Sequence, residues 1–169
     1  MTRQALNSLK AGTYRHVDYL DNDGIELDKL VPIEVAVTIE NGRMTCDFTG
    51  TSPQVRGPFN CMASGPYAAA CFALRSVTDP EGRIPNNGGC FRPLAFHLPE
   101  GSLVNPREPA PTGCRTSTIK RITTAILGAL RQSAVTIVSP SDASGAILSA
   151  EKPKPLQPLD APLQGVGRK

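Results

Sequence analysis

Alternating apolar and polar residues predict a β-hairpin in the first third of the chain. From Val31 to Ile39 every second residue of VPIEVAVTIE is apolar, which is the two-residue period of a strand with one buried face. Asn41-Gly42 follows, a dipeptide that favours the two-residue turn of a hairpin. The segment RMTCDF, residues 43–48, is therefore expected to return as the second strand.

A two-residue turn also sets the register of the two strands. Each apolar residue then meets an apolar partner on one face of the hairpin, and two threonines meet on the other. The expected pairs are Glu40 with Arg43, Ile39 with Met44, Thr38 with Thr45, Val37 with Cys46, and Val35 with Phe48. After this strand the flexible Gly50 lets the chain leave the sheet, with Asp47 on the polar face and Phe48 turned toward the core.

Two further strands are expected on either side of the hairpin in the sequence. Residues 12–20, GTYRHVDYL, alternate with Tyr14, His16 and Asp18 on one face, and the turn formers Asp-Asn-Asp-Gly follow at residues 21–24. Residues 93–98 form a short strand in which alternate residues are apolar.

Two helices are expected further along the chain. Residues 66–77, PYAAACFALRSV, begin with a proline, which suits the first turn of a helix, after Ser64 or Gly65 as the cap. Residues 117–132 carry one apolar stripe at helical spacing, with Thr116 or Ser117 as the cap. The members of the stripe are Ile119, Ile122, Ile126 and Leu130.

These elements predict an α+β fold. Its expected parts are an antiparallel hairpin or meander sheet, two packed helices and long loops rich in glycine and proline. Residues 1–134 are expected to form this domain. Residues 135–169 differ in character, and their last part, from residue 151, holds four prolines and no aromatic residue. Such a composition buries too little apolar surface to offset chain entropy, so residues 135–169 are expected to be a disordered tail.

Composition argues against several classes of protein. The 169 residues carry a net charge of +3, with Lys and Arg scattered along the chain, which argues against nucleic-acid binding. There is no run of 18 apolar residues and no apolar signal-peptide core near Met1, so neither a membrane span nor secretion is expected. Five cysteines without a C-x-x-C pair suit reduced thiols in the cytoplasm.

No common catalytic or metal-binding motif is present in the sequence. There is no Walker motif, Rossmann fingerprint or G-x-S-x-G elbow. A calcium loop around residues 21–24 would need an acidic residue at position 19 and a glutamate at position 30, where the chain has Tyr19 and Leu30. The spacing of histidines and cysteines supports no zinc site, so no metal site is expected.

Three loops carry the polar groups that could orient a substrate. They span residues 49–60, 86–92 and 113–118, and each offers amides and hydroxyls at the end of an element, although turns use the same residue types. The candidate catalytic residues are Asp47, Asn60, Asn86, Cys90 and Arg92. The candidate substrate-binding residues are Thr49, Thr51, Arg56, Arg115 and Thr116.

Cys90 follows two asparagines and two glycines that could expose its thiol. A thiolate nucleophile would need a lowered pKa, from a cation such as Arg92 or from a helix N-terminus. The alternative is a small buried side chain beside a turn, and both interpretations stay open at this point.

Four stretches of the sequence resemble the hydantoinase B/5-oxoprolinase family, which includes N-methylhydantoinase B subunits and the matching half of 5-oxoprolinase. They are GTYRHVDYLDNDG, VTIENGRMTCDFTGTSPQVRGPFN, IPNNGGCFRPLAFHLPEGSLVNPREPAP and TSTIKRITTAILGAL. The resemblance runs in continuous order from Met1 to about Ala134. It implies part of a cytoplasmic enzyme that opens a hydantoin or 5-oxoproline ring at the expense of ATP. Related subunits occur in acetone and acetophenone carboxylases.

The resemblance also implies a division of labour. In such enzymes an A-type partner phosphorylates the oxygen of the cyclic amide, and the B-type subunit completes the hydrolysis of the resulting imidate-like species. Positioned donors and a positioned water would lower the remaining barrier. ATP and a divalent metal are therefore expected in the complete enzyme, with no cofactor on this chain. The expected partners are the A-type subunit, the remaining B-type regions and a small cyclic amide.

The resemblance further implies that this sequence is a fragment from the middle region of a B-type subunit. Family members are longer, and their Asp/His metal positions lie in an N-terminal part that this sequence does not contain. Independent hydrolysis is therefore not expected. The apolar face of the hairpin or the stripe of the second helix is expected to be partly uncovered, so that the isolated chain associates or is poorly soluble. Three alternatives stay open: a non-catalytic interaction module, a subunit of a related acetone or acetophenone carboxylase-type complex, and a thiol enzyme built on Cys90.

Overall fold

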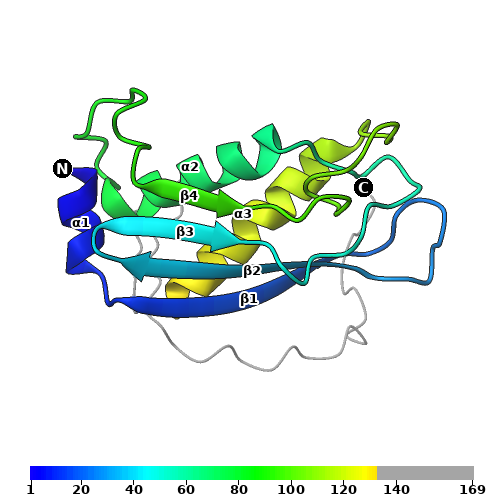
Figure 1. The fold of residues 1–169 in the computed structure, drawn as a ribbon, viewed down its shortest axis with the longest axis horizontal. Coiled ribbons are helices and arrows are strands. Elements are labelled where there is room, and N and C mark those ends of the chain that lie inside the picture. Colours follow the sequence, from blue (N-terminus) through cyan, green and yellow to red (C-terminus); the bar gives the residue numbers. More distant parts are fainter. Residues whose placement is uncertain (133–169) are drawn as a thin grey trace, which may run out of the picture.

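The fold is built on a four-stranded sheet in the order β1-β2-β3-β4, with helices α2 and α3 behind one face and helix α1 at one end (Figure 1). The computed structural model describes residues 1–132, so the tail predicted over residues 135–169 lies outside the described residues. The elements are α1 (Thr2–Ser8), β1 (Gly12–Leu20), β2 (Val31–Glu40), β3 (Arg43–Asp47), α2 (Ser64–Thr78), β4 (Leu94–His97) and α3 (Arg115–Arg131). None of the helices within residues 1–132 is long and apolar enough to cross a membrane.

The hairpin of β2 and β3 has the predicted register from Glu40 paired with Arg43 down to Val37 paired with Cys46. Its turn residues Asn41 and Gly42 have φ angles of +50° and +67°, as a two-residue hairpin turn requires.

The predicted pair of Val35 with Phe48 is not part of the ladder, which ends at Ala36 and Asp47. The Phe48 N–H instead donates to the carbonyl of His97 at 3.0 Å, because β4 lies beside the end of β3. Phe48 still turns into the core, where its side chain is fully buried.

The α+β class is confirmed, but the sheet is mixed rather than antiparallel throughout. β4 pairs with β3 in parallel, from Met44 with Leu94 to Asp47 with His97. Parallel neighbours need a long crossover, which α2 and its flanking loops supply here. Both strands therefore finish at the same end of the sheet, and the loops that follow Asp47 and His97 start side by side.

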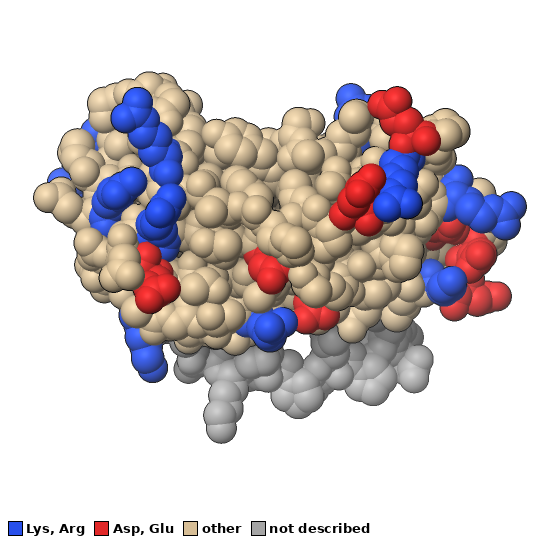
Figure 2. All heavy atoms as spheres, in the orientation of Figure 1, with Lys and Arg blue, Asp and Glu red and all other residues tan. Residues whose placement is uncertain are grey.

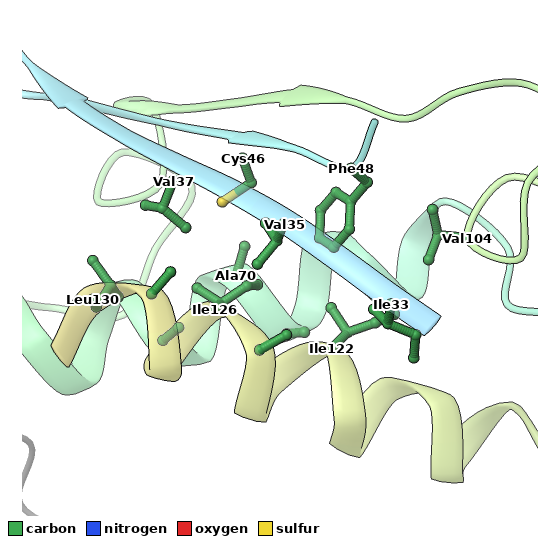
Figure 3. Packing of buried hydrophobic residues seen from close by; sticks show 14 of the residues in the cluster. Ile33, Val35, Val37, Cys46, Phe48, Ala70, Val104, Ile122, Ile126 and Leu130 are labelled. Atoms are coloured by element: carbon green, nitrogen blue, oxygen red, sulfur yellow. The ribbon is translucent and has the colours of Figure 1, made fainter. Parts of the chain in front are cut away.

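Helices α2 and α3 cover the apolar face of the sheet (Figure 3). The apolar residues of β2 from Val31 to Ile39 are no more than 4% exposed on this face, and Ile122, Ile126 and Leu130 of α3 are fully buried against them. The expectation of an uncovered hairpin face was therefore wrong, because the hairpin and α3 bury each other. Within the α3 stripe only Ile119 is partly exposed.

Both long helices begin earlier than predicted, and neither uses a predicted cap. The N-cap residues are Ala63 for α2 and Cys114 for α3, and neither makes a side-chain capping bond. Gly65 lies inside the first turn of α2, where a Cβ would clash with the sulfur of Cys61, so this glycine permits close packing rather than capping. Helix α1 was not predicted, because its seven residues are too few to show the helical spacing of apolar residues.

Candidate functional site

A cavity of about 480 Å³ lies at the end of the sheet where β3 and β4 finish. Two loops enclose it, residues 21–30 between β1 and β2 and residues 48–60 after β3. We call it the loop cavity, and its volume is in the range of small-molecule sites. Its lining residues are Asp23, Glu26, Lys29, Leu30, Val31, Pro32, Gly50, Thr51, Ser52, Pro53, Gln54, Val55 and Arg56.

Hydrogen bonds attach the second of these loops to β2 beyond the end of β3. The Thr51 hydroxyl donates to the carbonyl oxygen of Glu34 at 2.9 Å and accepts from the Glu34 N–H at 3.1 Å. The Ser52 N–H donates to the carbonyl of Pro32 at 2.9 Å. Thr51, a predicted substrate-binding residue, thus lines the loop cavity with a hydroxyl that is already bonded to β2.

Residues 101–107 support the outer side of the same loop. The Leu103 N–H donates to the Ser52 carbonyl at 2.9 Å, and the Gln54 N–H donates to the Gly101 carbonyl at 2.8 Å. The Gln54 side chain accepts from the Arg107 N–H at 2.8 Å and donates to the Arg107 carbonyl at 3.3 Å. The cavity wall is therefore braced by a segment that follows β4 in the sequence.

The buried side chain of Asn60 joins several backbone groups of this loop by hydrogen bonds. Its side-chain oxygen accepts from the Val55 N–H at 2.8 Å. Its amide nitrogen donates to the carbonyls of Val55, Gly57 and Pro111 at 2.7, 3.2 and 3.1 Å. The side chain is fully buried and does not line the loop cavity, so its bonds are all made within the chain.

Asp23 shapes the first loop and joins it to the second. Its buried carboxylate accepts from the N–H groups of Glu26 at 2.7 Å, Ile25 at 2.8 Å and Gly57 at 3.3 Å. The Glu26 and Ile25 N–H groups hold the pKa of Asp23 below its usual range. At Gly57 a Cβ would clash with the Asp23 carbonyl oxygen, so the two loops touch through glycine. This role of Asp23 was not predicted from the sequence. An aspartate whose carboxylate accepts hydrogen bonds from the N–H groups two and three residues later is nevertheless a known turn pattern.

The charges in the loop cavity leave one guanidinium available. Lys29 pairs with Glu26 at 3.1 Å, and the Asp23 carboxylate is taken up by backbone N–H groups. Arg56 is exposed and makes no ion pair or hydrogen bond with any residue in the described range 1–132. Beside it Pro53 and Val55 add apolar surface. This arrangement suits a small molecule that carries a polar or anionic group.

Asp47 and Thr49 lie at the same end of the sheet, outside the loop cavity. The Asp47 carboxylate accepts from the Thr49 N–H at 2.9 Å and from its hydroxyl at 2.7 Å. Burial would raise the pKa of Asp47, but these two bonds, with His97 and Arg15 nearby, outweigh burial and lower the pKa. On this side of the molecule the charged side chains gather mainly toward the two ends, with few in the middle (Figure 2).

Arg115 and Thr116 begin α3 and are both exposed. The Cys114 N–H donates to the carbonyl of Pro58 at 2.8 Å, which fastens the start of α3 to the loop that follows β3. The structure thus gathers all five predicted substrate-binding residues, with Asp47 and Asn60, at one end of the sheet.

Asn86, Cys90 and Arg92 lie at the other end of the sheet, in the loop that leads into β4. Because β3 and β4 are parallel, the start of β4 is separated from the end of β3 by the length of a five-residue strand, roughly 15 Å. Cys90 and Arg92 line a separate cavity of about 420 Å³ together with Arg3. The Cys90 thiol is buried and donates to the Asn87 carbonyl at 2.9 Å. The predicted catalytic residues therefore form two groups.

Comparison with known proteins gives a family match over most of the chain. A family model described as hydantoinase B/oxoprolinase matches residues 1–156. An uncharacterized protein of Methanocaldococcus jannaschii is 40% identical over 115 residues, which are 68% of this chain and 19% of that protein. A Pseudomonas sp. protein named as the B subunit of a D-/L-hydantoinase is 36% identical over 141 residues, 78% of this chain and 24% of that protein. 5-Oxoprolinase 1 of Arabidopsis thaliana is 32% identical over 120 residues, 70% of this chain and 9% of that protein.

Two solved structures share the fold. The ATP-dependent caprolactamase from Pseudomonas jessenii matches with a TM-score of 0.68 and 27% identity, over 79% of this chain and 23% of that chain. An acetone carboxylase in its nucleotide-free form matches with a TM-score of 0.57 and 19% identity, over 75% of this chain and 20% of that chain. The second likeness shows the fold alone. The chain spans less than a quarter of the length of each of these proteins.

Proposed function

The chain belongs to the hydantoinase B/oxoprolinase family, and from this premise we propose that it is part of the B-type subunit of an ATP-dependent cyclic amide hydrolase. The substrate would be a hydantoin or 5-oxoproline type of ring. Relatives named as 5-oxoprolinase and as a hydantoinase B subunit, and the likeness to an ATP-dependent caprolactamase, support this reaction class. Since the chain covers only part of each relative, it would act with the remaining B-type regions and with an A-type subunit that uses ATP.

The loop cavity is the observation that carries this proposal to individual residues. Its apolar wall suits the carbon atoms of a small ring, and the unpaired guanidinium of Arg56 suits an oxygen that bears negative charge. In the phosphorylated ring the former carbonyl oxygen carries a phosphoryl group, whose negatively charged oxygens a guanidinium can bind and stabilise. We therefore assign Arg56 to substrate binding and to the stabilisation of that charge.

The other predicted residues take supporting places in this proposal. Thr51 shapes the cavity wall through β2, and Asn60 holds the loop from below. Asp47, Thr49 and the Arg115–Thr116 pair lie at the same end of the sheet, where neighbouring B-type regions would complete the site. Asn86, Cys90 and Arg92, at the opposite end, would belong to a separate contact.

ATP and a divalent metal are assigned to the complete enzyme rather than to this part of it. Residues 1–132 contain no group of three or more His, Cys, Asp or Glu side chains that could hold a metal ion. The sequence also has no Walker motif for phosphate groups. The contribution that we propose for this chain is to bind and orient the ring.

The test is ring opening by the chain reconstituted with the remaining B-type regions and an A-type subunit. Arg56→Gln should lower kcat/KM by roughly 10- to 100-fold, because a hydrogen bond to a charged group contributes about 1.5–3 kcal/mol. Arg56→Lys should recover part of the loss, since it keeps the charge without the planar fork.

Arg43→Gln is the matched control for Arg56→Gln. Arg43 is also an exposed arginine without an ion pair among residues 1–132, but it begins β3 at the far end of the sheet. If both variants lose activity equally, or if neither does, the assignment of Arg56 fails.

A further inference from the structure

The outer edge of the sheet at β1 has backbone groups whose direction can be assigned. In an antiparallel pair, alternate residues direct N–H and C=O to the partner strand, and the residues between them direct both groups away. The carbonyl of Arg15 accepts from the side chain of Gln132 at 2.6 Å, and the N–H of Tyr19 donates to the Asp18 carboxylate at 2.8 Å. The odd-numbered residues of β1 therefore face away from β2.

The partner strand agrees with this assignment. Tyr19 lies opposite Pro32, which has no N–H to offer, and Val17 lies opposite Glu34. Glu34 directs its own N–H and carbonyl to Thr51, on the side of β2 away from β1. Two independent sets of hydrogen bonds thus give β1 the same outward edge.

This edge is open among the described residues. The N–H and C=O groups of Thr13 and Val17 point outward and have no partner within residues 1–132. The pairing of β1 with β2 is continuous over nine residues without a bulge, and β1 contains no proline, so nothing in the strand blocks a further neighbour. The side chains of Val17 and Tyr19 are 36% and 44% exposed beside the open groups.

We propose that the β1 edge, residues 13–19, receives an additional strand from the part of a B-type subunit that lies outside this chain. This inference rests on the proposed function, because it takes the chain as one part of such a subunit. The likeness to the caprolactamase covers 23% of that chain, so most of such a protein is available to supply the strand. At the other edge, β4 has only four residues, so β1 is the longer place for the sheet to grow.

The side chains at the edge show what the added strand would replace. Gln132 donates an amide to the Arg15 carbonyl, and Asp18 accepts from the Tyr19 N–H, so each supplies a group that a neighbouring backbone would supply. An incoming strand would exchange bonds with Thr13 and Val17 and would move the Gln132 side chain aside. Affinity would come from the backbone and selectivity from side chains that contact Val17 and Tyr19.

The test is co-expression of the tagged chain with the Pseudomonas sp. hydantoinase B-type subunit from which the matching segment has been removed. The wild-type chain should retain this truncated protein on an affinity column. Val17→Pro removes an outward N–H without breaking a bond to β2, so retention should fall by about tenfold or more. Val17→Ala keeps the N–H and should retain the truncated protein nearly as well as the wild type. Val17→Lys, which keeps the fold's backbone bonds but places a charge beside the new strand, should also weaken retention.

Three results would overturn the proposal. The first is equal retention by the wild type and Val17→Pro, or no retention by either, while the Arg56 experiment tests the proposed function separately. The second is a dimer of the isolated wild-type chain, seen by light scattering, that Val17→Pro abolishes, since a second copy would then occupy the edge. The third concerns the Tm of the isolated chain. His16→Pro removes an N–H that is directed to β2, so it should lower the Tm more than Val17→Pro does. An equal fall for both variants would mean that the chain's own residues bond to the outward N–H of Val17.

Discussion

Several polar side chains at the end of the sheet hold the chain together, whereas the Arg56 guanidinium does not. Backbone groups are the hydrogen-bond partners of the Asn60, Asp23 and Thr51 side chains. The Arg56 guanidinium has no partner among the described residues. A carboxamide or a carboxylate can serve a turn or a substrate equally well by residue type. Only the positions of its neighbours decide between the two roles.

Replacing Asn60 with alanine should lower the free energy of unfolding by about 2–4 kcal/mol, because buried backbone groups of the loop lose their partner. Asn60→Asp should be at least as damaging, since a carboxylate does not donate to the three carbonyls that Asn60 contacts. Urea unfolding followed by circular dichroism measures both, with the exposed Asn7→Ala in α1 as the control. An Asn60→Ala variant that is as stable as the wild type but inactive would instead support a catalytic role.

At the scale of helices and strands, the sequence predicted those features that depend on residues close together in the chain. The alternation of β2 and the Asn41-Gly42 turn determined the hairpin and its register, and the apolar stripe located α3. The parallel direction of β4 was not predictable, because its partner β3 lies far away in the sequence and a short alternating segment carries no sign of direction. For the same reason the bracing of the loop cavity by residues 101–107 was missed. Turn-forming residues showed where that segment bends but not what it contacts.

The loop of residues 21–30 should lose stability at low pH through Asp23. Its pKa is lowered in the folded chain by the Glu26 and Ile25 N–H groups, so its contribution is present above the ordinary pKa of about 4 and is lost as pH falls through the lower folded value. Urea midpoints at pH 6 and pH 3 should therefore differ more for the wild type than for Asp23→Asn. Asp28→Asn, an exposed change in the same loop, should leave the wild-type difference intact. Equal differences for all three proteins would contradict this role of Asp23.

At the scale of the whole molecule, the apolar faces predicted to be open are largely covered within residues 1–132, and the exposed apolar side chains lie elsewhere. They include Ile25, Leu27 and Leu30 in the loop of residues 21–30, each at least 50% exposed, and Tyr67 and Phe72 on α2, which are 47% and 48% exposed. Val17 and Tyr19 at the β1 edge belong to the same set. Such surface is expected in a part that contacts further protein. That the isolated chain associates or is poorly soluble thus stays a prediction. These exposed apolar side chains are the surface through which it would associate.

The buried thiols should report opening of the whole fold. Burial raises the pKa of Cys46 to about 12 and that of Cys61 to about 11, so neither should react with iodoacetamide at pH 8 while the chain is folded. Their labelling midpoints in urea should coincide with the midpoint from circular dichroism. Exposed Cys114 should react without urea and serves as the internal control. Labelling of Cys46 well below the midpoint would show that the sheet opens locally.

The parallel pairing of β3 and β4 has a consequence for the order in which the chain assembles. The β2–β3 hairpin closes over two residues, whereas β4 joins β3 only after α2 and two long loops have been folded back, which carries a larger entropic cost. Residues 101–107, which brace the loop cavity, come later still in the sequence. We therefore expect the hairpin to form first and the end of the molecule that holds the loop cavity to form in the final steps of folding. A chain emerging from the ribosome would have its sheet started long before the loop cavity was enclosed.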